Sequence, residues 1–292
     1  MKSILPDQYA VEKQFNSRVD NFFAKYEISK KLRRCNFRKT KGFSCLEIFK
    51  FIFLLVFSGK NLYRTLQSEA DSGMPQKDTI YRFLNSCRYN WRKFLLTLSS
   101  TIIKETIEPL KPHSWKNVLI LDDSLYSRNR SKAVELLARV RDHVEHKYVL
   151  GFRMLTLGWS DGNTFLPVAF SLLSSENEHN RLCGINQRLD KRTTGYKRRM
   201  ESIKKSTEVM FDLLRQAQEH GIKARYLLFD SWFAFPAIIC KVREHRLHVI
   251  CMLKSMKKVL YTYKGEKMNL DTLYKELLKK PGRAKILANA FV

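Results

Sequence analysis

The stretch "VLILDDSLYS", residues 118–127, carries four apolar residues directly into two acidic ones, Asp122 and Asp123. A short apolar run rich in branched residues is typical of a buried strand. A second stretch, "RYLLFDSWFAFP" at 225–236, follows the same pattern and reaches Asp230 after its apolar run. If the two strands are neighbours in one sheet, their carboxylates form one shared polar site.

The residues around these strands predict the rest of an α/β core. Residues 147–174 read as two strands joined by a turn at Asp161-Gly162, a strong hairpin signal. A helix that stops at Gly221, a strand at 224–229, a helix from Pro236 to His245 and a strand at 247–253 follow. The order β-β-β-α-β-α-β predicts an α/β fold, a mixed sheet with flanking helices.

The flanks of this core differ from it in pattern. Residues 1–112 carry helical periodicity, with Ser44 and Glu47 spaced as a capping box and Gly59 as a helix terminator. The two prolines of "EPLKPHSW" mark a predicted boundary, so we expect a helical N-terminal region at 1–112 and the core at 113–254. Residues 255–292 read as a hairpin at Lys264-Gly265, a short helix and an apolar strand that reaches Val292. Because an unpaired apolar strand rarely ends a finished domain, we interpret the chain as C-terminally truncated.

The helical region contains a pattern that resembles a helix-turn-helix. The break "SGMPQ" separates two helix-patterned segments, and in that motif the second helix enters the major groove of DNA. Short helices broken by Gly and Pro also build ordinary bundles, so both interpretations remain open. Under the first, the second helix presents these side chains to DNA: Tyr81, Arg82, Asn85, Arg88 and Arg92.

The charge of the chain predicts a polyanionic partner. Lys and Arg number 54 against 28 Asp and Glu, a net charge of +26. An anionic membrane is the alternative, yet the longest apolar run, residues 48–57, is interrupted by Lys50 and is much shorter than the roughly 20 residues of a spanning helix. With no secretory signal pattern and no paired cysteine spacing, we expect a cytoplasmic protein with reduced thiols.

A cluster of basic residues follows the predicted hairpin and is a second candidate for phosphate contact. A run of like charges is usually a solvated loop, and in a chain this basic a contact with DNA phosphate is an equal alternative. The cluster consists of Arg188, Lys191, Arg192, Lys197, Arg198, Arg199, Lys204 and Lys205.

The two acid-ended strands suggest a metal site. Carboxylate oxygens suit hard cations such as Mg²⁺, which proteins hold with one or two carboxylates plus phosphate and water. Two such ions stabilise the attacking and leaving oxygens of an in-line phosphoryl displacement. Each acid taken alone is equally well explained as a polar strand end or, for Asp230 before Ser231, as a helix cap.

Together, "VLILDDS", the hairpin strands and "YLLFDSWFAFP" resemble the catalytic core of the IS4-type DDE transposases, over roughly residues 20–292. That family consists of cut-and-paste enzymes with an RNase H-like fold. The resemblance implies Asp122 as the first catalytic and metal-binding acid, with Asp123 as the fallback, and Asp230 as the second. It also implies Mg²⁺, with Mn²⁺ as a substitute. The implied partners are double-stranded DNA, both element terminal repeats and target, and a second copy in a homodimer on DNA in the nucleoid.

The third acid of that family is a Glu within a Y-x2-R-x3-E-x6-K pattern, on a helix beyond a β-rich insertion. The resemblance implies that residues 255–292 are the start of this insertion, and the chain departs from the pattern of the third acid. Glu276 follows Tyr274 by only two residues, and Leu277 occupies the position of the Arg. We therefore expect these 292 residues to lack the third acid and to be inactive in cleavage. The alternatives are a non-catalytic fragment that binds DNA or inhibits by dimerising, and a related metal-dependent nuclease.

Overall fold

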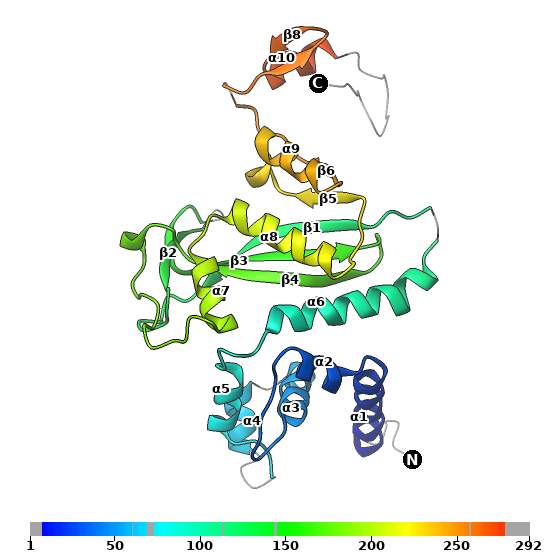
Figure 1. The fold of residues 1–292 in the computed structure, drawn as a ribbon, viewed down its shortest axis with the longest axis vertical. Helices are drawn as coiled ribbons and strands as arrows, with labels where there is room; N and C mark the ends of the chain where they lie inside the picture. Colours follow the sequence, from blue (N-terminus) through cyan, green and yellow to red (C-terminus); the bar gives the residue numbers. More distant parts are fainter. Residues whose placement is uncertain are drawn as a thin grey trace, which may run out of the picture.

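The computed structural model describes residues 8–59, 61–68, 73–112, 114–142, 145–256 and 258–277. Its N-terminal part is helical, and these helices gather on one side of α6, which itself lies along the sheet (Figure 1). The helices are α1 (Gln8–Lys25), α2 (Ile28–Arg34), α3 (Cys45–Ser58), α4 (Leu62–Ser68), α5 (Lys77–Leu84) and α6 (Trp91–Ile102), followed by the short turns Ile103–Ile107 and Glu108–Leu110.

The predicted limits of α3 are confirmed. The Ser44 hydroxyl accepts the Glu47 amide and the Glu47 carboxylate accepts the Ser44 amide, which is the complete capping box. Gly59 ends the helix in the left-handed region at φ 66°, a conformation that glycine adopts without steric cost. The helix packs into an aromatic-rich core in which the Phe37 ring stacks on Tyr89, with 4.5 Å between ring centres.

The second part is a mixed sheet with further helices. Its central path is β2-β3-β1-β5-β6, and β4 also pairs with β3. The strands are β1 (Val118–Ser127), β2 (Ala138–Arg141), β3 (Tyr148–Ser160), β4 (Phe165–Leu173), β5 (Tyr226–Phe229) and β6 (His248–Cys251), and the helices are α7 (Thr194–Ser202), α8 (Ser206–Glu219) and α9 (Pro236–Glu244).

Strand β1 is the centre of this sheet. It pairs antiparallel with β3 along its whole length and parallel with β5, and β5 pairs parallel with β6. Strands β2 and β4 both pair with the β3 edge opposite β1, one after the other. Three antiparallel strands, β4-β3-β1, followed by two parallel ones, β5-β6, form the RNase H-like order that the resemblance implies. The prediction of an α/β fold with a mixed sheet and flanking helices is confirmed.

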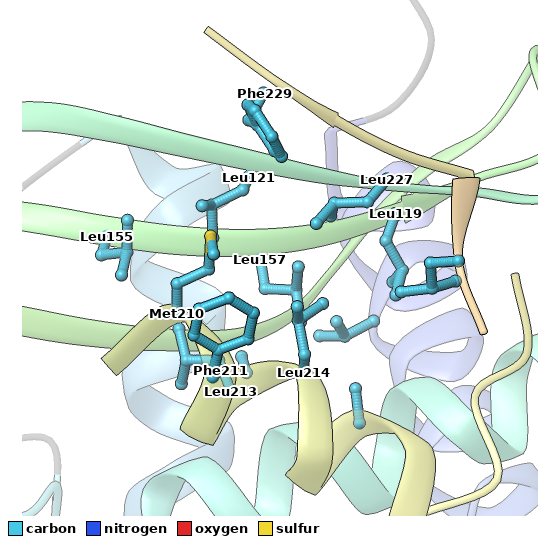
Figure 2. Close-up of a cluster of buried hydrophobic side chains, with 14 of the residues drawn as sticks. Leu119, Leu121, Leu155, Leu157, Met210, Phe211, Leu213, Leu214, Leu227 and Phe229 are labelled. Carbon is cyan, nitrogen blue, oxygen red and sulfur yellow. The ribbon is translucent and has the colours of Figure 1, made fainter. Parts of the chain in front are cut away.

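One face of the sheet forms the main hydrophobic core. Leu119 and Leu121 of β1 and Leu227 of β5 point to this face and are buried. Figure 2 shows them opposite Met210 and Leu214, which α8 presents from below the sheet. Because side chains alternate along a strand, the residues next to these leucines in β1 and β5 point to the opposite face of the sheet.

Helix α6 joins the helical region to the sheet. Its Phe94 is buried among the aromatic side chains of the helical core, whereas its Leu96 is buried against the sheet. Arg92, near the start of α6, is 3% exposed and reaches the carboxylate of Glu201 at the end of α7, with 2.9 Å between Nη1 and Oε2. Its Nε also donates to the Phe170 carbonyl of β4. One buried guanidinium therefore connects α6, α7 and β4.

Several local expectations differ from the structure. Strand β1 continues through both acids to Ser127, because Asp122 and Asp123 have full β3 partners in Thr156 and Leu155. Strand β2 was not expected, and the single predicted helix before Gly221 is two helices, α7 and α8, that break at 203–205.

The predicted recognition helix is also divided. Helix α5 ends at Leu84, and α6 begins at Trp91 with the Asn90 side chain as its cap, accepting the Lys93 amide at 3.0 Å. The residues between them pack on α7, where the Gly195 amide donates to the Cys87 carbonyl at 2.7 Å. The prediction that a single helix presents residues 81–92 to a DNA groove is therefore wrong.

The last described elements match their prediction. Strands β7 (Tyr261–Tyr263) and β8 (Glu266–Met268) form the hairpin that turns at Lys264-Gly265, and α10 (Leu270–Glu276) follows. The predicted apolar strand near the end of the sequence lies outside the described residues. Among the helices that the structure describes, none combines the length and apolar character needed to cross a bilayer.

The Arg92–Glu201 pair generates a stability prediction. Arg92→Met removes the cation and leaves a carboxylate that is 9% exposed with only Arg198 and Ser171 as partners. Breaking a buried pair on one side is strongly destabilising, so we expect a loss of about 3 kcal/mol in the free energy of unfolding. Urea unfolding followed by circular dichroism measures it.

The matched control is Arg215→Met on α8, whose partner Glu219 is 54% exposed. Exposed pairs contribute at most about 1 kcal/mol. Equal losses in the two variants would contradict the role assigned to Arg92.

Glu201 also makes stability depend on pH. Burial alone raises the pKa of this carboxyl, but the hydrogen bond and charge of Arg92, aided by Arg198 and Ser171, outweigh it and lower the pKa below the ordinary 4.5. A lowered folded-state pKa stabilises the protein above pH 4.5, and this contribution disappears as the pH falls through the folded-state value. The melting temperatures of wild type and Glu201→Gln should therefore converge below about pH 4.5. A gap that stays constant down to pH 3 would contradict this assignment.

Candidate active site

The pairing of β1 with β5 brings the two predicted catalytic acids to neighbouring positions near the centre of the sheet. Leu121 of β1 lies opposite Phe229 of β5 in a parallel register, so Asp122 and Asp230 follow one step later on adjacent strands. Adjacent strands of a sheet are about 4.8 Å apart, so the two side chains start from closely spaced backbones. The expectation that the strand carrying Asp122 and the strand leading into Asp230 are adjacent and parallel is confirmed.

Both acids face away from the main core. Leu121 and Phe229 are buried in it, and successive residues of a strand alternate between faces. Asp230 keeps an extended backbone (φ −70°, ψ 162°), so the alternation continues through it. Asp122 and Asp230 therefore share the opposite face, and both are exposed there.

Local hydrogen bonds orient each carboxylate. The Ser124 hydroxyl donates to Asp122 Oδ2 at 2.7 Å. Asp230 accepts the amide of Ser231 and caps the short 3₁₀ turn Ser231–Phe233, as the capping interpretation expects. Each contact uses one oxygen of its carboxylate, so each exposed acid keeps a second oxygen, Oδ1 of Asp122 and Oδ2 of Asp230.

Asp123, the fallback for the first acid, occupies the other face. Its carboxylate is 6% exposed and forms an ion pair with Arg153 of β3, whose Nε lies 3.0 Å from Oδ1. Because this carboxylate is enclosed beside the main core, it does not point toward Asp230. The structure favours Asp122 and assigns Asp123 to holding β1 against β3.

The donor set suits a hard cation. Two exposed carboxylates on one face, each with oxygens left over from its local hydrogen bond, match the ligands that Mg²⁺ takes from proteins. Within the described ranges no group of three or more His, Cys, Asp or Glu residues is placed to hold a metal. Glu276 ends α10, which lies well apart from β1 in Figure 1.

The predicted DNA contacts in the helical region are separated by the fold. Arg82 is exposed on α5, and its Nε donates to the Asp78 carbonyl of the same helix. Arg88 lies in the segment between α5 and α6. Arg92 is wrong as a DNA contact, because it is buried and bound to Glu201.

The basic cluster at 188–205 divides into free and engaged side chains. Arg198 and Arg199 are each about one third exposed and pair with Glu201 and Glu135, so both have structural partners. Arg192 pairs with Asp190, and Lys204 lies 3.6 Å from Asp212. Exposed lysines with no salt bridge in the described part of the chain complete the cluster: Lys191, Lys197 and Lys205.

Sequence analysis missed a groove whose lining comes from several separate segments. Trp232, two residues after Asp230, and Phe235 line it together with Arg139 and Arg141 of β2. The alternating pattern "ARVR" at 138–141 is the only local signal for β2, and its four residues are too few to predict a strand. The aromatic pair was visible in the sequence, but its neighbours come from distant segments.

Two solved transposase complexes align with the chain at low sequence identity. The P element transposase strand transfer complex from Drosophila aligns at 12% identity and a TM-score of 0.36, over 89% of this chain and 55% of that one. The piggyBac transposase synaptic complex aligns at 12% identity and a TM-score of 0.30, over 80% of this chain and 42% of that one. TM-scores this low do not establish a shared fold, so the fold assignment rests on the strand order. The chain spans little more than half of the first of these proteins.

No curated protein matches the chain. The protein-family model for DDE superfamily endonucleases matches residues 53–268, which is well over half of the chain. This span contains both Asp122 and Asp230. The chain therefore belongs to the DDE superfamily endonucleases.

Proposed function

We propose that this chain is an IS4-like transposase of the cut-and-paste type, which cuts DNA at the ends of an insertion sequence and joins them to target DNA. The observation that carries the proposal is the register of β1 and β5, which sets Asp122 and Asp230 side by side on one face. The family match supports the endonuclease chemistry.

In this proposal Asp122 and Asp230 hold Mg²⁺, with Mn²⁺ as a substitute. The bound metal supplies Lewis acidity and charge neutralisation at the phosphate that is cut. The Ser124 hydroxyl and the Ser231 amide keep the two carboxylates oriented, so little side-chain freedom is lost when they bind a cation. Asp123 and Arg153 keep β1 in register with β3 and thereby position Asp122.

The charge distribution supports double-stranded DNA as substrate, bound by a homodimer at the terminal repeats. The net charge of +26 already counts every Asp and Glu, so a large excess of cationic side chains has no acidic counterpart in the chain. Among the predicted contacts, Lys191, Lys197 and Lys205 are exposed and suited to phosphate, with Arg82 and Arg88 on the helical side.

The lack of a third catalytic acid is the reason that we expect cleavage to fail. The sequence contains no Y-x2-R-x3-E motif, and α10, which Glu276 ends, lies well apart from β1 in Figure 1. Two carboxylates suffice to hold one cation, whereas two-metal chemistry needs further fixed ligands. We therefore expect these 292 residues to bind metal and DNA without specific cleavage.

Metal binding tests the carboxylate pair directly. Asp122→Asn and Asp230→Asn each remove one anionic ligand, so each should weaken Mn²⁺ binding at least about tenfold. Electron paramagnetic resonance of free Mn²⁺ measures the binding without any cleavage assay. Asp20→Asn on α1, where the carboxylate pairs with Lys50, is the matched control and should bind as wild type does.

Cleavage is followed in parallel as nicking of supercoiled plasmid in Mg²⁺ or Mn²⁺. Unchanged Mn²⁺ binding in both Asn variants would overturn the metal assignment. Nicking by the wild type that disappears in Glu276→Ala would instead show that Glu276 completes the site.

The salt dependence of DNA binding tests the basic cluster. Lys191 and Lys197 are exposed and have no acidic partner in the described part of the chain, so they are free to release counterions from DNA. Replacing both with Gln should make the log-log slope of duplex affinity against salt shallower by about 0.9 for each phosphate that the variant no longer neutralises. Filter binding across a salt series measures the slope.

The control is Lys30→Gln on α2, a lysine that already pairs with Glu27. A slope that stays the same in the double variant would reassign residues 188–205 to a passive solvated surface.

A further inference from the structure

A groove of about 550 Å³ lies between the end of β1, the last residues of β4 and α7. We call it the Tyr126 groove. Three apolar side chains of its lining, Tyr126, Phe170 and Leu172, are 39%, 38% and 37% exposed. Four arginines add guanidinium groups to the lining, whereas Glu135 is the one carboxylate among these described residues. The groove therefore combines an apolar floor with an excess of positive charge.

The register of the sheet places this groove on the same face as the two candidate acids. Tyr126 follows Asp122 by four residues along β1, so the alternation of side chains puts both on one face. Asp122 lies opposite Thr156 of β3, and Thr156 lies opposite Phe170 of β4. Residues that are directly opposite in a sheet share a face, so Phe170 also points to the carboxylate side.

One DNA duplex can reach both the acids and the groove. Four residues of a strand span about 13 Å, and two strand spacings span about 10 Å. A duplex advances about 3.4 Å for each base pair, so 13 Å corresponds to about four base pairs. The groove is therefore close enough to contact the same DNA molecule, a few base pairs from the acids.

Arg128 is the available cation of the groove. It is exposed, and no salt bridge between described residues engages it. Its guanidinium lies 4.2 Å from the centre of the Tyr126 ring and donates to the Tyr126 hydroxyl. Arg130 and Lys132 are also exposed, and residues 124–134 contain no acid. The loop after β1 therefore continues the groove with positive charge that attracts phosphate.

The other three arginines of the lining have structural partners. Glu201 engages Arg92 and Arg198, and Glu135 engages Arg199. These ion pairs hold α6 and α7 against the sheet and so fix one wall of the groove. The loop after β1 supplies the cations that remain available to a ligand.

This combination of groups fits the sugar-phosphate backbone of duplex DNA. Phosphates bind arginine and lysine, and contacts to phosphate and sugar position a duplex without reading its sequence. Exposed apolar side chains gathered on one surface mark a contact site, and the apolar faces of deoxyribose suit them. The two kinds of side chain therefore match the two parts of the backbone.

We propose that the Tyr126 groove and the loop after β1 hold the backbone of duplex DNA about four base pairs from the carboxylate pair, with phosphates on Arg128, Arg130 and Lys132 and sugars against Tyr126 and Phe170. The inference rests on the proposed action on DNA and adds the path of the duplex. That path runs from the acids along β1 toward the loop before β2.

Duplex binding tests the three cations. Replacing Arg128, Arg130 and Lys132 together with Gln should weaken the affinity for a labelled duplex about tenfold or more in fluorescence anisotropy. The log-log slope of affinity against salt should become shallower by about 0.9 for each phosphate that is no longer neutralised. Two duplexes of unrelated sequence should be affected equally, because the contacts are to the backbone.

The matched control replaces three cations at the other end of β1, Lys223, Arg225 and Arg246, with Gln. These residues are exposed, and no salt bridge between described residues engages them. The Arg225 amide donates to the Asn117 carbonyl just before β1, which places this group at the start of the strands. Both triple variants lower the net charge equally, so the control should lose little affinity. Thermal melting verifies that each variant is folded.

Affinity cleavage tests whether the groove positions DNA at the acids. Fe²⁺ replaces Mg²⁺ at the carboxylate pair, and hydrogen peroxide with ascorbate then produces hydroxyl radicals that cut DNA close to the metal. At protein concentrations that saturate the duplex, cutting per bound duplex should fall about threefold or more in the Arg128, Arg130 and Lys132 variant, because the DNA is no longer held at the metal. The control variant should cut as the wild type does.

The outcomes separate this proposal from the proposed function. Equal loss of duplex affinity in the two triple variants would assign the effect to overall charge and overturn the groove. Unchanged affinity in the Arg128, Arg130 and Lys132 variant, or iron cleavage equal to that of the wild type, would overturn the groove and leave the proposed function standing. A loss limited to one of the two duplex sequences would overturn the backbone contact. A wild type that binds Mn²⁺ but no duplex would contradict the proposed function itself.

Discussion

The parallel pairing of β1 with β5 is the constraint on which the site depends. Residues 118–121 and 226–229 are in register, so the residues that follow them, Asp122 and Asp230, lie side by side although 108 positions separate them in the chain. The main core enforces that register, because a slip of one residue would exchange the buried leucines for the acids. The burial of Leu119, Leu121 and Leu227 and the exposure of the two carboxylates therefore follow from the same strand register.

The same alternation assigns opposite roles to the two adjacent acids of β1. Asp122 faces solvent with Asp230, whereas Asp123 is enclosed and compensated by Arg153. A carboxylate that already has a cation inside the protein has little reason to bind a metal, while an exposed pair on one face has no such partner in its immediate hydrogen bonds. Two successive residues of β1 therefore have different roles: Asp122 is the candidate metal ligand, and Asp123 is a structural ion-pair partner.

Charge in this chain also divides between structural and available groups. Arg92, Arg198 and Arg199 are engaged by Glu201 and Glu135, where they connect the helical region, α7 and the sheet. Breaking such ion pairs alters stability more than affinity. Exposed cations without acidic partners among the described residues occur both in the basic cluster and in the groove lined by Arg139, Arg141 and Trp232. A polyanion would contact these groups without disturbing the core.

The sequence by itself determined the class of the fold, the hairpin at Asp161-Gly162, the capping box of α3 and the apolar strands that lead into Asp122 and Asp230, because each depends on residues close together in the chain. It did not predict strand β2 or the break between α5 and α6, where Asn90 caps a new helix and Cys87 bonds to Gly195. It also assigned Arg92 to DNA, although that side chain is buried with Glu201, 109 residues away. Local pattern specifies whether a residue lies on a helix or a strand. Which face it occupies, which charge it meets and which segments enclose it are decided by long-range packing, and therefore only by the tertiary structure.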